Sequence, residues 1–196
     1  MKNIDVVINV GKKNMENKHY DLRAVALASM NWNTLDYQYE DGIKKQEFRY
    51  LLKTLFGFTN HKTKVVIETL LEIGIIVEKE NEYLFQNVEG PSIILSFETA
   101  KFCVDNLSAL EFKIYCYFIF SKMEERYWYK TGGYFTIKEL IKLCGYSHSV
   151  RNYDMFKEAL NSLENFGLIK YSHDGVSKPG FGGVYKKLYE INEIKK

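Results

Sequence analysis

The sequence that decides the fold occupies the last third of the chain and reads FTIKELIKLCGYS (135–147), HSVRNYDMFKEALNSLENFGLIKYSH (148–173), DGVSKPGFGG (174–183) and VYKKLYEI (184–191). Together these segments predict a helix, a tight turn, a second helix and a β-hairpin with a glycine-rich tip. That order of elements is the layout of a winged helix-turn-helix.

Local signals indicate where these two helices begin and end. Thr136 and Glu139 have the spacing of a capping box, in which the hydroxyl accepts the third helical N–H and the carboxylate accepts the N–H of the cap. Gly145 lies where the chain must turn sharply, and glycine enters left-handed conformations at little cost. Gly167 is expected to end the second helix. Helical spacing predicts the core face of that helix: Phe156, Ala159, Leu160, Leu163 and Phe166.

An internal repeat extends this plan to the first half of the chain. It consists of two pairs of similar segments: LFGFT (55–59) with LCGYS (143–147), and VIETLLEIGII (66–76) with ALNSLENFGLI (159–169). Superposing Gly74 on Gly167 also superposes the apolar positions of both segments. We therefore expect an α+β, mainly helical protein with two tandem winged helix-turn-helix domains. The alternative is two amphipathic helical hairpins that are alike by chance.

The expected domain organisation has four parts: an N-terminal arm or strand over 1–19, a first winged-helix domain over 20–88, a linker over 89–107 and a second winged-helix domain over 108–196. Gly90 and Pro91 form the strongest break in the chain. In the first domain we expect Asp21 and Asn60 to cap helices and a hairpin to turn near Asn81.

The second domain opens with an unusually apolar helix. Ser108 and Glu111 form another capping box, directly before ALEFKIYCYFIF (109–120). Because this run is apolar on nearly all sides, we expect it to be buried on more than one side. Its extra neighbour would be either the first domain or a second protomer.

Composition limits the class of protein. The chain has 196 residues, of which 46% are hydrophobic and 27% charged, and its formal net charge is +2. These values are typical of soluble globular proteins. No apolar run approaches the roughly 20 residues of a membrane span, and the N-terminal sequence lacks a signal-peptide pattern. We therefore expect a cytoplasmic protein without a membrane partner.

Residue patterns give no support to catalysis or metal binding. Cys103, Cys116 and Cys144 are widely spaced, lack C-x-x-C spacing and have no neighbouring histidine, which predicts buried free thiols rather than a zinc site. The four histidines are scattered, and neither HExxH nor GxSxG occurs. We expect a non-enzymatic protein with no cofactor.

Two winged helices joined by a short linker resemble the replication initiator proteins of plasmids and phages. The segment NLSALEFKIYCYFIF (106–120), followed by FTIKELIKLCGYS and a long helix, is similar to the second domain of such proteins from low-GC Gram-positive bacteria. This resemblance covers most of the chain as architecture and pattern. It implies a protein that binds double-stranded DNA and acts in replication, whereas winged helices in general also regulate transcription or bind proteins.

The helix near 150–166 would enter the major groove, because the later helix of a helix-turn-helix presents its N-terminal side chains to base edges. Arg151 is suited to guanine and Asn152 to adenine. The full set of expected contacts on this helix is Ser149, Arg151, Asn152, Tyr153, Lys157 and Asn161. Asp154 and Glu158 lie among them and would repel phosphates, so a solvated helix face is the alternative interpretation.

Other basic residues would contact the DNA backbone without reading sequence. On the 170–190 wing these are Lys178, Lys186 and Lys187, and in the first copy they are Lys62 and Lys64. The first wing, EKENEY (78–83), is acidic, so the first domain is expected either to touch DNA or to form a homodimer. The cluster RYWYKTGGYF (126–135) is either a packed loop or a surface that stacks on single-stranded bases.

These observations lead to two functional hypotheses. The first is a cytoplasmic double-stranded DNA-binding protein that acts at the replication origin of a mobile element or as a transcription regulator. The second is a protein-interaction module whose winged helices bind a replisome component or a host-defence protein. The small net charge and the acidic residues of both copies favour the second hypothesis, whereas the basic residues near the second helix favour the first.

Overall fold

The first repeat forms an ordered unit of three helices and a small sheet. The computed structural model describes residues 5–17, 19–34, 42–86, 89–124, 132–177 and 184–194. The first unit consists of α2 (Leu22–Thr34), β2 (Ile43–Lys44), α3 (Lys45–Phe56), α4 (Asn60–Ile73), β3 (Ile76–Lys79) and β4 (Glu82–Phe85). Its strands are antiparallel, in the order β2-β4-β3.

The second repeat has the same order of elements. It consists of α6 (Ala109–Met123), β6 (Tyr134–Phe135), α8 (Ile137–Leu143), α9 (Val150–Asn165), β7 (Ile169–Tyr171), β8 (Val176–Ser177) and β9 (Val184–Ile191). The strand order β6-β9-β7 matches that of the first sheet, and β8 pairs with β9. In both units the last strand therefore lies in the middle of the sheet. The expected α+β class is confirmed at this level.

A third layer joins the two units. β1 (Asp5–Asn9) pairs antiparallel with β5 (Ser92–Ser96), and α5 (Phe97–Asn106) follows β5 directly. The N-terminal run is thus a strand, which decides between the two alternatives of an arm and a strand. The short helix α1 (Lys12–Glu16) contacts α8 of the second unit.

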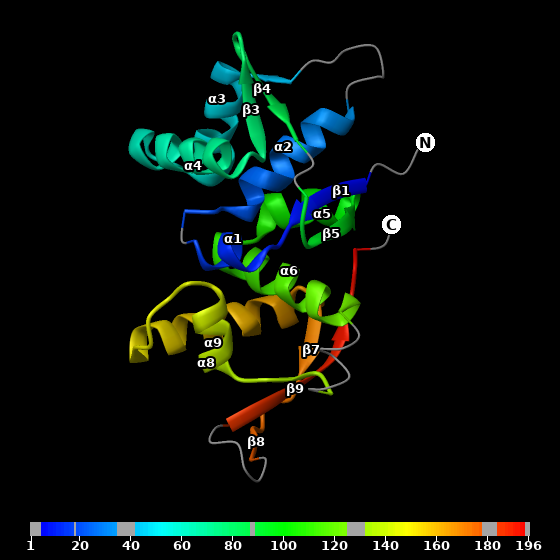
Figure 1. Ribbon diagram of the computed structural model, residues 1–196. Helices are drawn as coiled ribbons and strands as arrows, with labels where there is room; N and C mark the ends of the chain where they lie inside the picture. Colours follow the sequence, from blue (N-terminus) through cyan, green and yellow to red (C-terminus); the bar gives the residue numbers. More distant parts are fainter. Residues whose placement is uncertain are drawn as a thin grey trace.

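The apolar helix α6 lies at the centre of the molecule, on the side of the second unit that faces the first (Figure 1). It packs against α9 of its own unit, α2 of the first unit and β5 of the joining layer. The expectation that α6 has more than one buried side is confirmed, and its extra neighbour is the first unit. The buried side chains of both units and of the joining layer form one continuous cluster.

Most helix ends follow the local signals. Both capping boxes are present, at Thr136 with Glu139 and at Ser108 with Glu111. The predicted cap at Asn60 is wrong, because Thr59 occupies the extended cap position and its hydroxyl accepts the N–H of Lys62. Asn60 is instead the first residue of α4.

The turn glycines have the expected left-handed backbone. Gly145 has a φ of 79° and Gly167 a φ of 70°. Gly167 lies one residue beyond the C-cap Phe166, and it permits the turn from α9 into β7. The three cysteines are buried free thiols, as predicted. No helix in the described part of the chain is long and apolar enough to span a bilayer.

Candidate nucleic-acid interface

The helix α9 has one buried and one exposed face. Phe156, Ala159, Leu160 and Leu163 are buried, in agreement with the predicted core face, whereas Phe166 is 40% exposed. Ser149 caps the helix, since its hydroxyl accepts the N–H of Asn152. The first turn places exposed side chains on the opposite face: Val150, Arg151 and Tyr153. This face also carries the acidic residues Asp154 and Glu158.

Two of the predicted base-reading residues, Asn152 and Asn161, make hydrogen bonds within the protein. The side-chain amide of Asn152 donates to the carbonyl of Ser147 at 2.7 Å, which closes the turn before α9. The side-chain oxygen of Asn161 accepts the hydroxyl of Tyr171 at 2.6 Å, which ties α9 to β7. Each amide therefore keeps only part of its hydrogen-bonding capacity for a ligand.

Lys157 of α9 and Lys186 of β9 both contribute positive charge on the side of the second sheet that faces α9. Burial lowers the pKa of Lys186, and the nearby charge of Lys157 lowers it further, whereas Asp174 and Glu164 oppose these effects. The ammonium of Lys186 donates to the carbonyl of His173 at 3.0 Å and lies 5.2 Å from the centre of the Tyr171 ring. A helix and a strand thus contribute one lysine each to a shared surface.

Lys187 lies on the other face of the sheet. In β9, Lys186 is paired with the buried Phe135, whereas Lys187 is paired with Tyr134. Successive side chains of a strand point to opposite faces, and the ammonium of Lys187 lies 5.2 Å from the Tyr189 ring and 5.8 Å from the Tyr134 ring. The two wing lysines, although adjacent in sequence, cannot present one common surface.

Carboxylates pair with some of the basic residues of the first unit. Lys64 pairs with Glu68 along α4 at 3.7 Å. Lys45, at the start of α3, pairs with Glu78 of the acidic hairpin. The ammonium of Lys62 lies 4.1 Å from the centre of the Phe58 ring and has no carboxylate partner among the described residues.

Some predicted features fall outside the described residues. Lys178 and the glycine-rich tip of the wing lie in 178–183, and the basic aromatic run before Gly132 lies in 125–131. From that aromatic cluster the structure describes Gly132 to Phe135, of which Tyr134 and Phe135 form β6.

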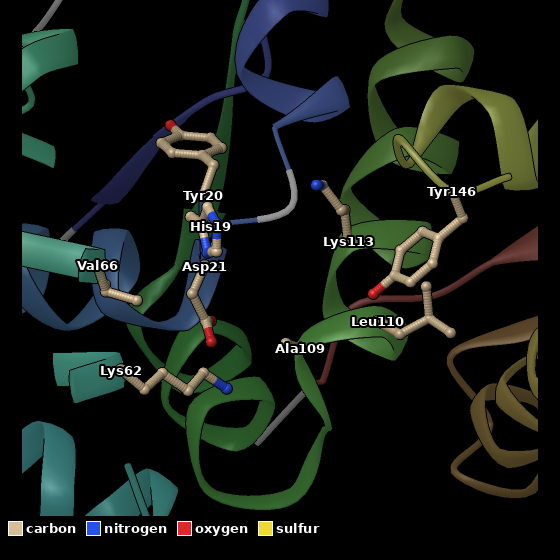
Figure 2. Close-up of a pocket in the computed structure, with 9 residues that line it drawn as sticks. All are labelled: His19, Tyr20, Asp21, Lys62, Val66, Ala109, Leu110, Lys113 and Tyr146. Carbon is tan, nitrogen blue, oxygen red and sulfur yellow. The ribbon is translucent and has the colours of Figure 1, made fainter. Parts of the chain in front are cut away.

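A pocket of about 120 Å³ lies at the junction between the two units (Figure 2). One wall comes from the first unit and the residues that lead into it, and the other comes from α6 and the turn between α8 and α9. The lining residues are His19, Tyr20, Asp21, Lys62, Val66, Ala109, Leu110, Lys113 and Tyr146. Lys62 from α4 is the one predicted nucleic-acid contact among them.

Sequence reasoning missed Lys113, which together with Asp21 is one of two charged residues in this pocket wall that are nearly inaccessible to solvent. Only 5% of Lys113 is exposed, and its ammonium donates to the carbonyl of Asn17 at 3.1 Å. The signal was present: Lys113 is the single charged residue between Glu111 and Lys122 in a long apolar helix. Charged side chains are rarely buried without a specific partner.

Comparison with known protein families, with curated proteins and with solved structures finds no match to this chain.

Proposed function

We propose that this protein binds double-stranded DNA through two tandem winged helix-turn-helix domains. The second domain would read the major groove with α9 and contact the backbone with the hairpin formed by β7, β8 and β9. The shared element order α-β-α-α-β-β, to which the second unit adds the short strand β8, supports this assignment, as does the last strand in the middle of each sheet. The biological setting would be the replication origin of a mobile element or a regulated promoter.

The observation that carries the proposal is the set of basic residues on and beside α9, namely the exposed Arg151 and Lys157 and the half-buried Lys186. Arg151 presents five donors from the first turn of the helix, where a major-groove contact is expected. Lys157 and Lys186 lie close enough for the charge of one to affect the pKa of the other. Two cations held together cost electrostatic energy, and a bound phosphate backbone would offset that cost.

A second candidate function is protein binding by the first unit. A groove of about 480 Å³ lies between α3, α4 and the β3–β4 hairpin, and Arg49 and Lys53 contribute to its wall. The acidic residues beside it are partly neutralised, because Glu78 pairs with Lys45 and Glu68 with Lys64. A replisome component or a host-defence protein with an acidic segment would suit this groove.

The test of DNA binding is a titration of mixed-sequence duplex DNA at low and near-physiological salt. We expect micromolar affinity that falls steeply with salt, since each neutralised phosphate releases a counterion. Arg151→Ala should relax the sequence preference found by selection from random duplexes. Lys157→Ala and Lys186→Ala should weaken binding to all sequences and reduce the salt slope.

Lys187→Ala provides a matched control on the same strand. It removes the same charge from the neighbouring position but from the opposite face of the sheet, so its effect on duplex affinity should be much smaller than that of Lys186→Ala. Absence of binding at low salt would contradict the DNA-binding function and would favour the protein-binding candidate. Equal effects of the two lysine substitutions would contradict the role given to the α9 side of the sheet.

A further inference from the structure

The geometry points to a second binding site, in the junction pocket, that accepts a phosphate group between Lys62 of the first unit and Lys113 of the second. The site is separate from the exposed face of α9 and does not depend on the proposed DNA-binding function. An anion held there would contact both units at once and would bias how they are positioned relative to each other.

The charges of the pocket favour an anion. Among the described lining residues Asp21 is the one carboxylate, and both of its oxygens already accept hydrogen bonds from Arg23, including one of 2.8 Å from Nη2. Asp21 is therefore paired with Arg23, although its charge still raises the pKa of Lys113. The charges of Lys62 and Lys113 remain without a carboxylate partner in the described part of the chain.

Lys113 is the residue of the site that most favours an anion, because its buried ammonium has donors to spare. A buried ammonium has three N–H donors, and the structure gives it one acceptor among the described residues, the carbonyl of Asn17. Burial is the larger influence on its pKa and lowers it, while Cys144 and Asp21 act in the opposite direction. An oxyanion in the pocket would supply acceptors and negative charge to this ammonium.

The remaining walls supply neutral donors. Tyr146 contributes a hydroxyl, and burial raises its pKa, so the hydroxyl keeps its proton and can donate. Ala109 and Leu110 are the first residues of α6, where backbone N–H groups have no acceptor within the helix. Figure 2 shows Lys62 and Tyr146 reaching toward the pocket from opposite sides. The two walls thus offer a phosphate group one lysine each, Lys62 from the first unit and Lys113 from α6, together with neutral donors.

The test is titration calorimetry of inorganic phosphate into the full chain, with sodium chloride at equal ionic strength as the reference. We expect one saturable site and a rise in melting temperature with phosphate. Lys113→Met and Lys62→Met should each weaken phosphate binding at least tenfold. Lys101→Met, which removes an exposed lysine on α5, should leave it unchanged.

Lys62→Met keeps the proposal testable if Lys113→Met does not fold, because Lys62 is exposed. Absence of phosphate binding beyond the chloride reference, or wild-type affinity in Lys62→Met, would overturn the site. A mixed-sequence duplex then separates two sources of the phosphate group. If saturating duplex displaces inorganic phosphate, a backbone phosphate of DNA occupies the pocket. If it does not, the ligand is a small free phosphate compound.

Discussion

At the scale of single residues, some polar side chains of α9 are available to a ligand, whereas others make hydrogen bonds that stabilise the fold. The hydroxyl of Tyr171 donates to the side-chain oxygen of Asn161 at 2.6 Å and thereby joins β7 to α9. Burial, and to a smaller extent Glu164, raises the pKa of Tyr171 to about 12. Tyr171 is almost fully buried. The hydroxyl therefore stays protonated in the folded protein at pH values where it already ionises in the unfolded chain.

Tyr171→Phe should reveal this hydrogen bond through the pH dependence of stability. Below pH 10 we expect the variant to be about 1 kcal/mol less stable than wild type, which is typical for the loss of one hydrogen bond. Between pH 10 and 12 the tyrosine ionises first in the unfolded chain, so wild type should lose about 2 kcal/mol that the variant does not lose.

Urea denaturation of both proteins between pH 8 and 12 measures this difference. The order of stabilities should reverse within that interval. A constant difference across the interval would contradict the contribution of the hydroxyl.

At the scale of elements, Gly145 determines how the turn between α8 and α9 meets α1. Its φ is 79°, and a Cβ atom at this position would lie 2.0 Å from the carbonyl oxygen of Glu16. Gly145→Ala should therefore combine an unfavourable left-handed backbone with a direct clash, for a total cost of about 2–4 kcal/mol. The α1 segment would have to move away from α8.

Gly74→Ala separates the two contributions to that cost. Gly74 has a φ of 82° at the end of α4, and a Cβ there would meet nothing within 4 Å. Its substitution should cost only about 1–2 kcal/mol, the penalty of the left-handed backbone. Equal losses of unfolding free energy in urea for the two variants would show that the contact with Glu16 is unimportant.

The elements that depend on local sequence could be predicted. Capping boxes, turn glycines and the core face of α9 follow from residues a few positions apart. The error at Asn60 also has a local cause: Thr59 and Asn60 are both good caps, and the backbone of Thr59 takes the extended conformation. The local sequence does not indicate which of the two residues caps α4.

The parts of the site that depend on distant contacts could not be predicted. Lys186 and Lys187 look equivalent in the sequence, and only their pairing with β6 reveals that they face opposite sides. Asn161 looks available until β7 brings the Tyr171 hydroxyl to it. The pocket around Lys113 requires the two units to be packed together, which the internal repeat does not indicate.

At the scale of the whole molecule, β1 couples the two units. It pairs with β5 from Asp5 with Ser96 to Asn9 with Ser92, and it packs against α2. The residues that follow β1 reach the second unit through the contact between α1 and α8. The segment from Asp5 to Glu16 thus contributes to both halves of one continuous core. We expect the two units to unfold together.

Ile8→Ala tests that coupling. Ile8 is fully buried opposite Ile93, so its truncation should cost about 2–5 kcal/mol. Hydrogen exchange followed by mass spectrometry should then show faster exchange in both α4 and α9, because a cooperative molecule opens as one unit. Ile94→Ala is the matched control, since Ile94 is 54% exposed on the other side of β5 and its truncation should cost well under 1 kcal/mol. Faster exchange in α4 with unchanged protection of α9 would mean that the units unfold independently despite their shared core.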